Sequence, residues 1–212
     1  SLRYPLDIFR SVRLRTTLRS DATIPLASDS TVLNVPLTRE QRLGLGVEYV
    51  FDNTLDVSLN IKNGTRYKVY AEVVKGFQVQ VLDNASLNFN KGVMTILGLD
   101  FRHYQRLDKK SIFAVRAAGA TSFGSERILF QLGGVNQWLF PSFNQNIPSP
   151  PEDNLAYHVP VNNLRGFRLN IRNGNSYALL NNELRVPLLS YLFKKKSPFI
   201  RNFQTVAFFD VG

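Results

Sequence analysis

One arginine and two carboxylates have the right chemistry to form a buried ion pair. Arg165 precedes Gly166 in a segment rich in proline and asparagine, whereas Glu183 and Asp210 lie in later segments where apolar and polar residues alternate. A guanidinium offers five donors in a planar fork that matches a carboxylate, and glycine permits backbone geometry that a Cβ obstructs. We expect Arg165 to pair with Glu183, Asp210 or both. The alternative is an exposed loop arginine and two unrelated carboxylates.

The other residues that could do chemistry do not form a set. The chain has no cysteine, which excludes disulfides, thiol nucleophiles and cysteine-ligated metals. Its two histidines, His103 and His158, lack neighbours at the spacing of a metal site, which needs three or four ligands. Ser122, His103 and Asp100 could be drawn as a hydrolytic triad, but in the expected strands His103 points to the opposite face from the other two. We expect no enzyme, no metal and no cofactor.

The formal net charge of +10 raises nucleic acid as a partner, because clustered lysines and arginines gain affinity by releasing counterions. Here the basic residues stand singly or alternate with apolar ones, and the only run of three is Lys194, Lys195 and Lys196. A solvated turn explains that run more simply than a phosphate-binding patch does, and it is also favoured over a contact for an accessory subunit. We expect no nucleic-acid partner.

Strands must position the arginine and its carboxylates. From Leu43 to Asp52 the odd-numbered residues are apolar, and most of the residues between them are small or acidic. A period of two places one set of side chains on each face of a sheet. We expect Phe9–Ala27 to form one strand rather than a hairpin bent near Ser20 and Asp21. The remaining alternating segments are Thr65–Leu82, Leu87–Arg102, Phe113–Ser122, Ala178–Leu188 and Phe203–Val211.

Strand length separates the possible all-β architectures. Soluble strands run ~5 to 6 residues, whereas a tilted transmembrane strand needs ~9 to 11, with one apolar and one polar face. Several segments here are much longer than a soluble strand, and none has the ~18 to 20 apolar residues of a spanning helix. Lipid cannot satisfy backbone hydrogen bonds, so a membrane sheet must close. We therefore expect residues 1–212 to form part of an all-β, antiparallel transmembrane β-barrel whose other strands lie outside this sequence.

A long interruption separates Ser122 from Asn175, and we expect a loop at about residues 123–174. Loops of this length are usually functional or disordered. The aromatic residues in this segment argue against disorder; they include Trp138, Phe140, Phe143 and Tyr157. No targeting segment is visible, and the chain stops within an expected strand, as an excerpt from a longer polypeptide would.

Four ordered motifs carry a family resemblance. They are Leu132-Gly133-Gly134, then Leu164-Arg165-Gly166-Phe167, then NNELRVPL from Asn181, then FFDVG from Phe208. In this order they resemble the barrel of the BamA-like outer-membrane assembly factors, also called the bacterial surface antigen family. NGTRYKVYAE from Asn63 is similar to the family's periplasmic turn, although the proline often found there is absent. The segments GGVNQWLF and YVFDNT are most similar to Bacteroidetes members.

The resemblance covers roughly Leu43 to Gly212 and implies a fold. The family barrel has sixteen strands, of which this chain would hold strands seven to thirteen, in the outer membrane of a Gram-negative bacterium. The long loop would be extracellular, begin near Gly133 and Gly134, and fold back into the lumen. The tetrapeptide Leu164-Arg165-Gly166-Phe167 would then place its arginine beside the lumen-facing Glu183 and Asp210.

The function implied by the resemblance is insertion, assembly or translocation of other outer-membrane proteins. The implied partners are outer-membrane lipid and lipopolysaccharide, nascent outer-membrane proteins, and periplasmic or lipoprotein accessory subunits. The main alternative is a barrel of this architecture that acts as a membrane anchor, pore or receptor for an attached domain. A third possibility is a soluble all-β binding protein whose apolar faces pack together. What precedes Ser1 in the parent protein would separate the first two, because tandem periplasmic domains of the substrate-carrier type favour assembly and a propeller or enzyme domain favours anchoring.

Overall fold

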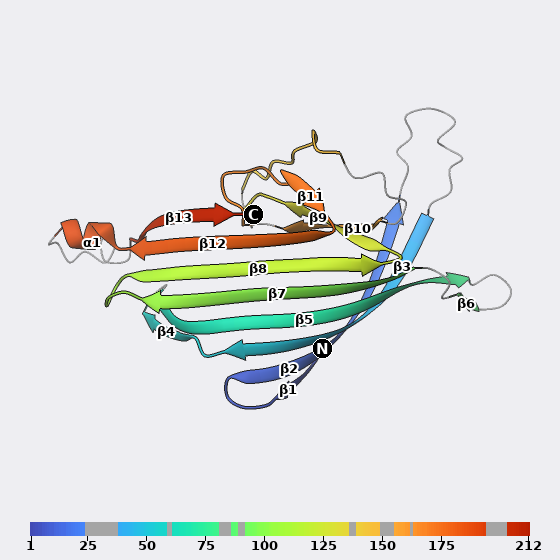
Figure 1. The fold of residues 1–212 in the computed structure, drawn as a ribbon, viewed down its shortest axis with the longest axis horizontal. Coiled ribbons are helices and arrows are strands. Elements are labelled where there is room, and N and C mark those ends of the chain that lie inside the picture. Colours follow the sequence, from blue (N-terminus) through green and yellow to red (C-terminus); the bar gives the residue numbers. More distant parts are fainter. Residues whose placement is uncertain are drawn as a thin grey trace.

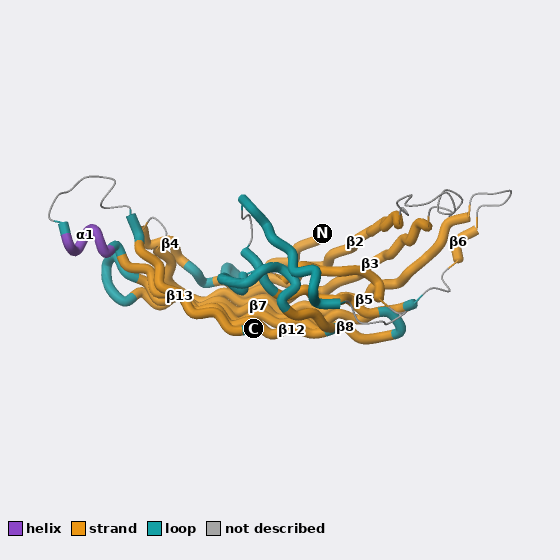
Figure 2. Tube along the Cα trace, turned by 90° about the horizontal axis from the view of Figure 1, so that it is seen from above, coloured by secondary structure: helices purple, strands orange, loops and turns teal. Residues whose placement is uncertain are grey.

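The computed structural model describes residues 1–23, 38–58, 61–80, 86–88, 92–135, 139–148, 155–161, 163–193 and 203–212. These described residues form a long, curved antiparallel sheet with a smaller sheet on its concave side (Figures 1 and 2). The part of the chain that is described contains one short helix, α1 (Leu188–Leu192). No helix within it has the length and apolar character needed to cross a membrane.

Eight strands of the large sheet pair in chain order, each antiparallel to the next, which confirms the all-β antiparallel prediction. They are β1 (Leu2–Pro5), β2 (Arg10–Thr23), β3 (Thr38–Asp52), β5 (Ile61–Gln80), β7 (Val93–Arg106), β8 (Ile112–Gly124), β12 (Ser176–Val186) and β13 (Thr205–Val211). Two short strands, β4 (Leu55–Ser58) and β6 (Ser86–Asn88), pair with β5. Among the described residues the sheet is open, because β1 and β13 are its two edges.

The meander gives the sheet two different ends. Tight connections join β1 to β2 at residues 6–9 and β7 to β8 at residues 107–111, and α1 follows β12 at the same end, which we name the turn end. The long connection from β8 to β12, residues 125–175, leaves from the opposite end, which we name the loop end. In Figure 1, α1 lies beyond one end of the strands, and the small sheet lies toward the other.

One face of the large sheet, which we name the outer face, is apolar and exposed. It carries the odd-numbered residues of β3, β5, β7, β8 and β13, and the even-numbered residues of β2 and β12, because residues opposite one another in register share a face. Exposed apolar side chains on it include Leu14, Leu45, Val47, Val69, Val73, Leu97, Leu99, Phe113, Leu180 and Phe209.

The opposite face, the inner face, is rich in paired charges. The Arg42 side chain on this face is only 4% exposed. It contacts the carboxylates of Asp21, Glu40 and Glu126 at 3.3, 2.6 and 3.3 Å. A buried charge needs such partners, because burial removes its hydration. Other ion pairs on this face are Arg15–Glu72, Arg116–Asp100 and Arg185–Glu183.

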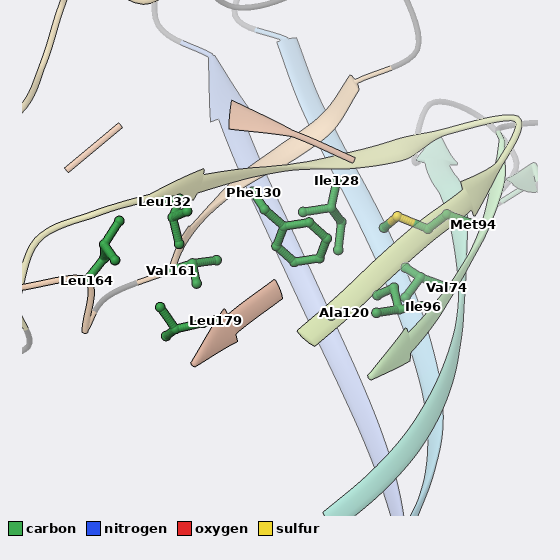
Figure 3. Close-up of a cluster of buried hydrophobic side chains, with 10 residues drawn as sticks. All are labelled: Val74, Met94, Ile96, Ala120, Ile128, Phe130, Leu132, Val161, Leu164 and Leu179. Carbon is green, nitrogen blue, oxygen red and sulfur yellow. The ribbon is translucent and has the colours of Figure 1, made fainter. Parts of the chain in front are cut away.

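The loop predicted at about 123–174 contains a second sheet, which we name the loop sheet. Its strands are β9 (Arg127–Leu132), β10 (Leu155–Val161) and β11 (Arg172–Gly174), with β10 parallel and β11 antiparallel to β9. Apolar side chains of the loop sheet and of the segment between β10 and β11 pack against the inner face near the loop end (Figure 3). The buried cluster is Val74, Met94, Ile96, Ala120, Ile128, Phe130, Leu132, Val161, Leu164 and Leu179.

The N-terminal region differs from the sequence prediction. β2 runs through Ser20 and Asp21 without a bend, as the one-strand prediction requires, and residues 24–27 lie outside the described part. The alternation did not reveal that β1 pairs with β2 as a hairpin. Its turn is stabilised by the Asp7 carboxylate, which accepts hydrogen bonds from the backbone N–H groups of Phe9 and Arg10, both at 2.7 Å. The segment predicted over Leu87–Arg102 is described as two strands that both pair with β5, since β6 ends at Asn88 and β7 begins at Val93, and residues 89–91 lie outside the described part.

Candidate functional site

Arg165 contacts both carboxylates that the sequence singled out. Its Nε donates to Asp210 Oδ2 at 2.6 Å and its Nη2 to Asp210 Oδ1 at 2.7 Å, a two-point contact that matches the guanidinium fork. Its Nη1 donates to Glu183 Oε1, and its backbone N–H donates to Asp210 Oδ2 at 3.1 Å. One side chain therefore joins the loop to β12 and β13 at once.

The Asp210 carboxylate is almost fully covered. Its side chain is 2% exposed, compared with 19% for Arg165 and 20% for Glu183. Asn181 also donates to Asp210 Oδ1 at 2.8 Å and to the Asn163 backbone carbonyl at 2.6 Å, so a neutral side chain shares the site. An uncompensated carboxylate at this depth would be costly, and Arg165 supplies the compensating charge.

The remaining faces of the ion pair are covered by a cation and an aromatic ring. Arg185 donates to Glu183 Oε2 at 2.9 and 2.7 Å, so this carboxylate lies between two guanidinium groups. The Phe208 ring centroid lies 4.0 Å from Arg165 Cζ, a cation–π contact. The hydrogen bond to Asp210 raises the pKa of Arg165 above its ordinary value, which keeps the guanidinium charged.

Two glycine motifs give the loop the shape that aims Arg165. Gly166 has φ +86°, a conformation that L side chains rarely adopt, although a Cβ there would meet no atom within 4 Å. Glycine is therefore needed there for its backbone angle rather than for space. Gly133 has φ +126°, and a Cβ on it would clash with the Arg168 carbonyl oxygen. The two motifs meet, because Gly134 donates to the Phe167 carbonyl at 3.0 Å.

The flanking members of the loop motif have different surroundings. Leu164 is buried in the apolar cluster under the loop sheet and forms an isolated bridge with Gly134. Phe167 is 52% exposed. The structure thus brings Gly133, Gly134, Leu164 and Arg165 together with their strand partners and leaves the Phe167 ring at the surface.

The structure does not bring together the residues that could be drawn as a hydrolytic triad. His103 lies on the outer face, with Nδ1 2.8 Å from Thr65 Oγ1, whereas Asp100 and Ser122 lie on the inner face. Ser122 Oγ accepts from Ile128 N–H at 2.9 Å and is close to two backbone carbonyls, so it is a structural residue. His158 is exposed on β10. The lysine run at 194–196 and Trp138 fall outside the described residues.

One contact in the loop was not anticipated from the sequence. The ring of Tyr157 on β10 lies under the Arg19 guanidinium, with Cζ 3.8 Å from the ring centroid, and Arg42 Cζ lies at 5.8 Å. In the sequence, the contact could have been suggested only by an aromatic residue in the loop and by two arginines among the polar residues of distant alternating segments. This contact holds the loop sheet to β2 and β3, far from Arg165.

The arrangement is suited to holding a folded loop, because its charged groups pair with one another. Within the described residues no three His, Cys, Asp or Glu side chains are placed to hold a metal ion. What the site can do is fix a loop inside a curved sheet through ion pairs at one side and a cation–π contact at the other. No family model, curated protein or solved structure matches this chain.

Proposed function

We propose that these strands form part of the membrane wall of a BamA-like outer-membrane β-barrel, and that the parent barrel acts in the insertion or assembly of other outer-membrane proteins. The observation that carries the membrane proposal is the exposed apolar outer face. Leu45, Leu97 and Phe209 on this face are 55%, 43% and 66% exposed. Soluble monomers rarely expose a continuous apolar surface across a whole sheet, whereas lipid favours it.

The distribution of charge supports the same proposal. The ion pairs of Arg15, Arg42 and Arg116 lie on the inner face, and the loop sheet covers that face as well. A soluble sandwich has the reverse arrangement, with its apolar face covered and its charges in water. Membrane barrels instead combine an apolar outside with a polar interior.

Aromatic residues on the outer face have the spacing of two membrane interfaces. Tyr67 and Phe77 on β5 are ten residues apart, as are Phe113 and Phe123 on β8. Ten residues of strand extend ~34 Å, or about 25 Å of membrane thickness at a tilt of ~40°. Phe113 on β8 is displaced by four residues toward the turn end relative to Tyr67 on β5. Tilted strands in a barrel produce such a stagger.

The assembly proposal depends on the loop motif. Four motifs occur in the order typical of the BamA-like family, and the loop arginine contacts the carboxylates on the two strands that follow it. This combination favours a barrel whose loop is fixed inside. In the family that these motifs resemble, the seam that engages incoming strands lies between the first and last strands of the barrel, and the resemblance would assign neither of these to this chain.

Neighbouring threonines provide a matched test of the membrane proposal. Thr16 and Thr17 on β2 are both exposed and lie on the outer and inner faces, opposite Leu45 and Gly44. The chain has no cysteine, so Thr16→Cys and Thr17→Cys each give one labelling site in the full-length protein if its other regions also lack cysteine. In lipid vesicles, a nitroxide at Thr16 should be accessible to oxygen and one at Thr17 to a water-soluble nickel chelate. Equal access of the chelate to both labels would reject the membrane wall.

Depletion of the parent protein tests the assembly proposal separately. An assembly factor is needed by many outer-membrane proteins, so their levels should fall broadly, as measured by quantitative proteomics of outer-membrane fractions. Re-expression of the wild-type protein should restore them. Unchanged levels would favour the anchor, pore or receptor alternative and would not contradict the proposal that these strands form part of a membrane wall.

A further inference from the structure

The turn end carries an exposed apolar surface that lies on α1 and on a turn, outside the strands of the sheet. Leu188, Tyr191 and Leu192 of α1 are 45%, 54% and 65% exposed. Their spacing of three and four residues places them on one face of the helix. Phe193 after the helix and Leu107 in the β7–β8 turn add 54% and 58% exposed apolar side chains. We name these five residues the turn-end patch.

A polar contact fixes α1 against the β7–β8 turn. The Tyr191 hydroxyl donates to Asp108 Oδ2 at 2.5 Å and lies 3.4 Å from Ser111 Oγ. Asp108 also accepts backbone N–H groups from Lys110 and Ser111 at 2.6 and 2.7 Å. These hydrogen bonds, that of Tyr191 first, lower the pKa of Asp108 to about 2. The exposed apolar face of α1 is therefore held in one orientation by a charged turn.

The position of α1 connects the turn-end patch with the proposed membrane surface. Phe113, which belongs to the aromatic level at the turn end, lies opposite Leu184 of β12 in register. Leu188 follows Leu184 by four residues, of which Arg185 and Val186 still belong to β12, so the helix begins beyond that level. Amphipathic helices at this depth lie in the boundary between headgroups and acyl chains.

The charges around the turn-end patch are mainly positive. Lys109 and Lys110 are exposed in the β7–β8 turn and outnumber the carboxylate beside them, Asp108. In the sequence, Lys194, Lys195 and Lys196 follow Phe193 directly. Lysines next to exposed leucine and aromatic side chains match the composition of interfacial helices that bind anionic lipid.

We propose that the turn-end patch is a lipid-binding surface, in which α1 lies in the headgroup region of an anionic phospholipid leaflet and Lys109 and Lys110 contact phosphate groups. The proposal rests on the membrane position proposed for the sheet. Its partner is a phospholipid bilayer and not a soluble protein, because α1 begins beyond Phe113, at the turn-end boundary proposed for the membrane, and exposed lysines lie in the adjacent β7–β8 turn. The surface would fix the vertical position of the turn end in the membrane.

The test uses an environment-sensitive dye on the full-length protein in vesicles of phosphatidylcholine with or without phosphatidylglycerol. Leu192→Cys carries the dye on the turn-end patch, and Leu97→Cys carries it on the outer face. Asp56→Cys on β4, at the same end and with a side chain 74% exposed, is the matched water control. The dye at Leu192 should shift to shorter wavelength and be quenched by nitroxide-labelled lipid, more strongly with phosphatidylglycerol, while the dye at Asp56 should not respond.

A second variant tests the charge contribution. Lys109→Gln combined with Lys110→Gln should weaken the phosphatidylglycerol-dependent insertion of the Leu192 dye by about fivefold per lysine. An unchanged response to phosphatidylglycerol would overturn the role of these lysines.

Two outcomes separate this inference from the proposed function. If the dye at Leu97 is in lipid but the dye at Leu192 is as water-exposed as that at Asp56, the lipid-binding surface is wrong and the membrane wall stands. Protection of Leu192 in native membranes but not in vesicles would likewise overturn it, in favour of a protein partner. If the dye at Leu97 is also in water, both proposals fail.

Discussion

An arginine is the only residue that can make all the contacts observed at position 165. It contacts Asp210 through Nε and Nη2 and Glu183 through Nη1, while the Phe208 ring stacks on its plane. A lysine carries the same charge on a single nitrogen, which cannot reach two carboxylates in this planar arrangement. Shape as well as charge therefore determines the residue at this position.

Arg165→Ala should lower the free energy of unfolding by about 2–3 kcal/mol, less than the ~3–5 kcal/mol typical of a fully buried pair, because Arg165 is partly exposed. Arg165→Lys should recover only part of the loss, since it keeps the charge but not the fork. Denaturant unfolding of the full-length protein in detergent micelles or lipid measures both. In a cycle with Asp210→Asn, the two substitutions should be strongly non-additive.

Arg172→Ala is the matched control for Arg165, because Arg172 is an exposed arginine on β11 of the same loop. It should leave the unfolding free energy within ~0.5 kcal/mol of wild type. An equal effect of both alanine variants, or full recovery by Arg165→Lys, would contradict the two-carboxylate interpretation.

Part of this site could be predicted from the sequence. Arg165, Glu183 and Asp210 carry complementary charges, and the strand phase placed both carboxylates on one face, so their pairing could be predicted. Asn181 and Phe208 were missed as partners, because their contacts with Asp210 and Arg165 depend on how β12 and β13 align. Strand register between segments separated by a long connection is not encoded in local alternation.

At the scale of elements, the loop sheet is held against the inner face at two distant places. Arg165 holds the segment after β10 to β12 and β13, and Tyr157 within β10 contacts Arg19 on β2. Between these places lies the apolar cluster around Phe130 and Leu132. The two polar contacts therefore fix the direction of a sheet whose burial is provided by apolar packing.

Substitution of Tyr157 tests the contact with Arg19. Tyr157→Phe keeps the aromatic face and should behave like wild type, whereas Tyr157→Leu removes it and should destabilise β10 locally by about 1 kcal/mol. Amide hydrogen exchange in β10 should then quicken about fivefold in the leucine variant, with little change in β5 or β7. Equal exchange rates in the two variants would show that apolar packing, and not the contact between the aromatic face and the Arg19 cation, holds β10 in place.

The elements themselves were predictable to different degrees. Long strands such as β3, β5, β8 and β12 follow from alternation, because one face is apolar over many residues. The loop sheet does not follow from it. β9 is a short apolar run, and β10 contains Pro160 and pairs in parallel with a strand over twenty residues earlier, so local sequence carries little signal for either.

At the scale of the whole molecule, the two faces of the sheet have opposite solvation. Charged residues such as Arg42 and Asp100 are paired on the inner face, while Leu45 and Leu97 are exposed on the outer face. In water this arrangement would be poorly stable, because the largest exposed surface would be apolar. In a bilayer the same apolar surface would contact lipid chains instead of water, and the ion pairs would lie on the side away from the lipid.

This difference predicts how a new charge on the outer face depends on its depth. Leu97 lies near the middle of the proposed apolar band on β7, whereas His103 lies two residues beyond Phe101, at the level of Thr65 near the turn end. In lipid vesicles, Leu97→Arg should cost about 2–4 kcal/mol of unfolding free energy and His103→Arg only about 0–1 kcal/mol. Leu97→Gln separates the loss of an apolar side chain from the effect of charge. If all three variants cost the same, the outer face lies in a uniform environment such as water, since only a bilayer makes the cost of one arginine depend on its height along a strand.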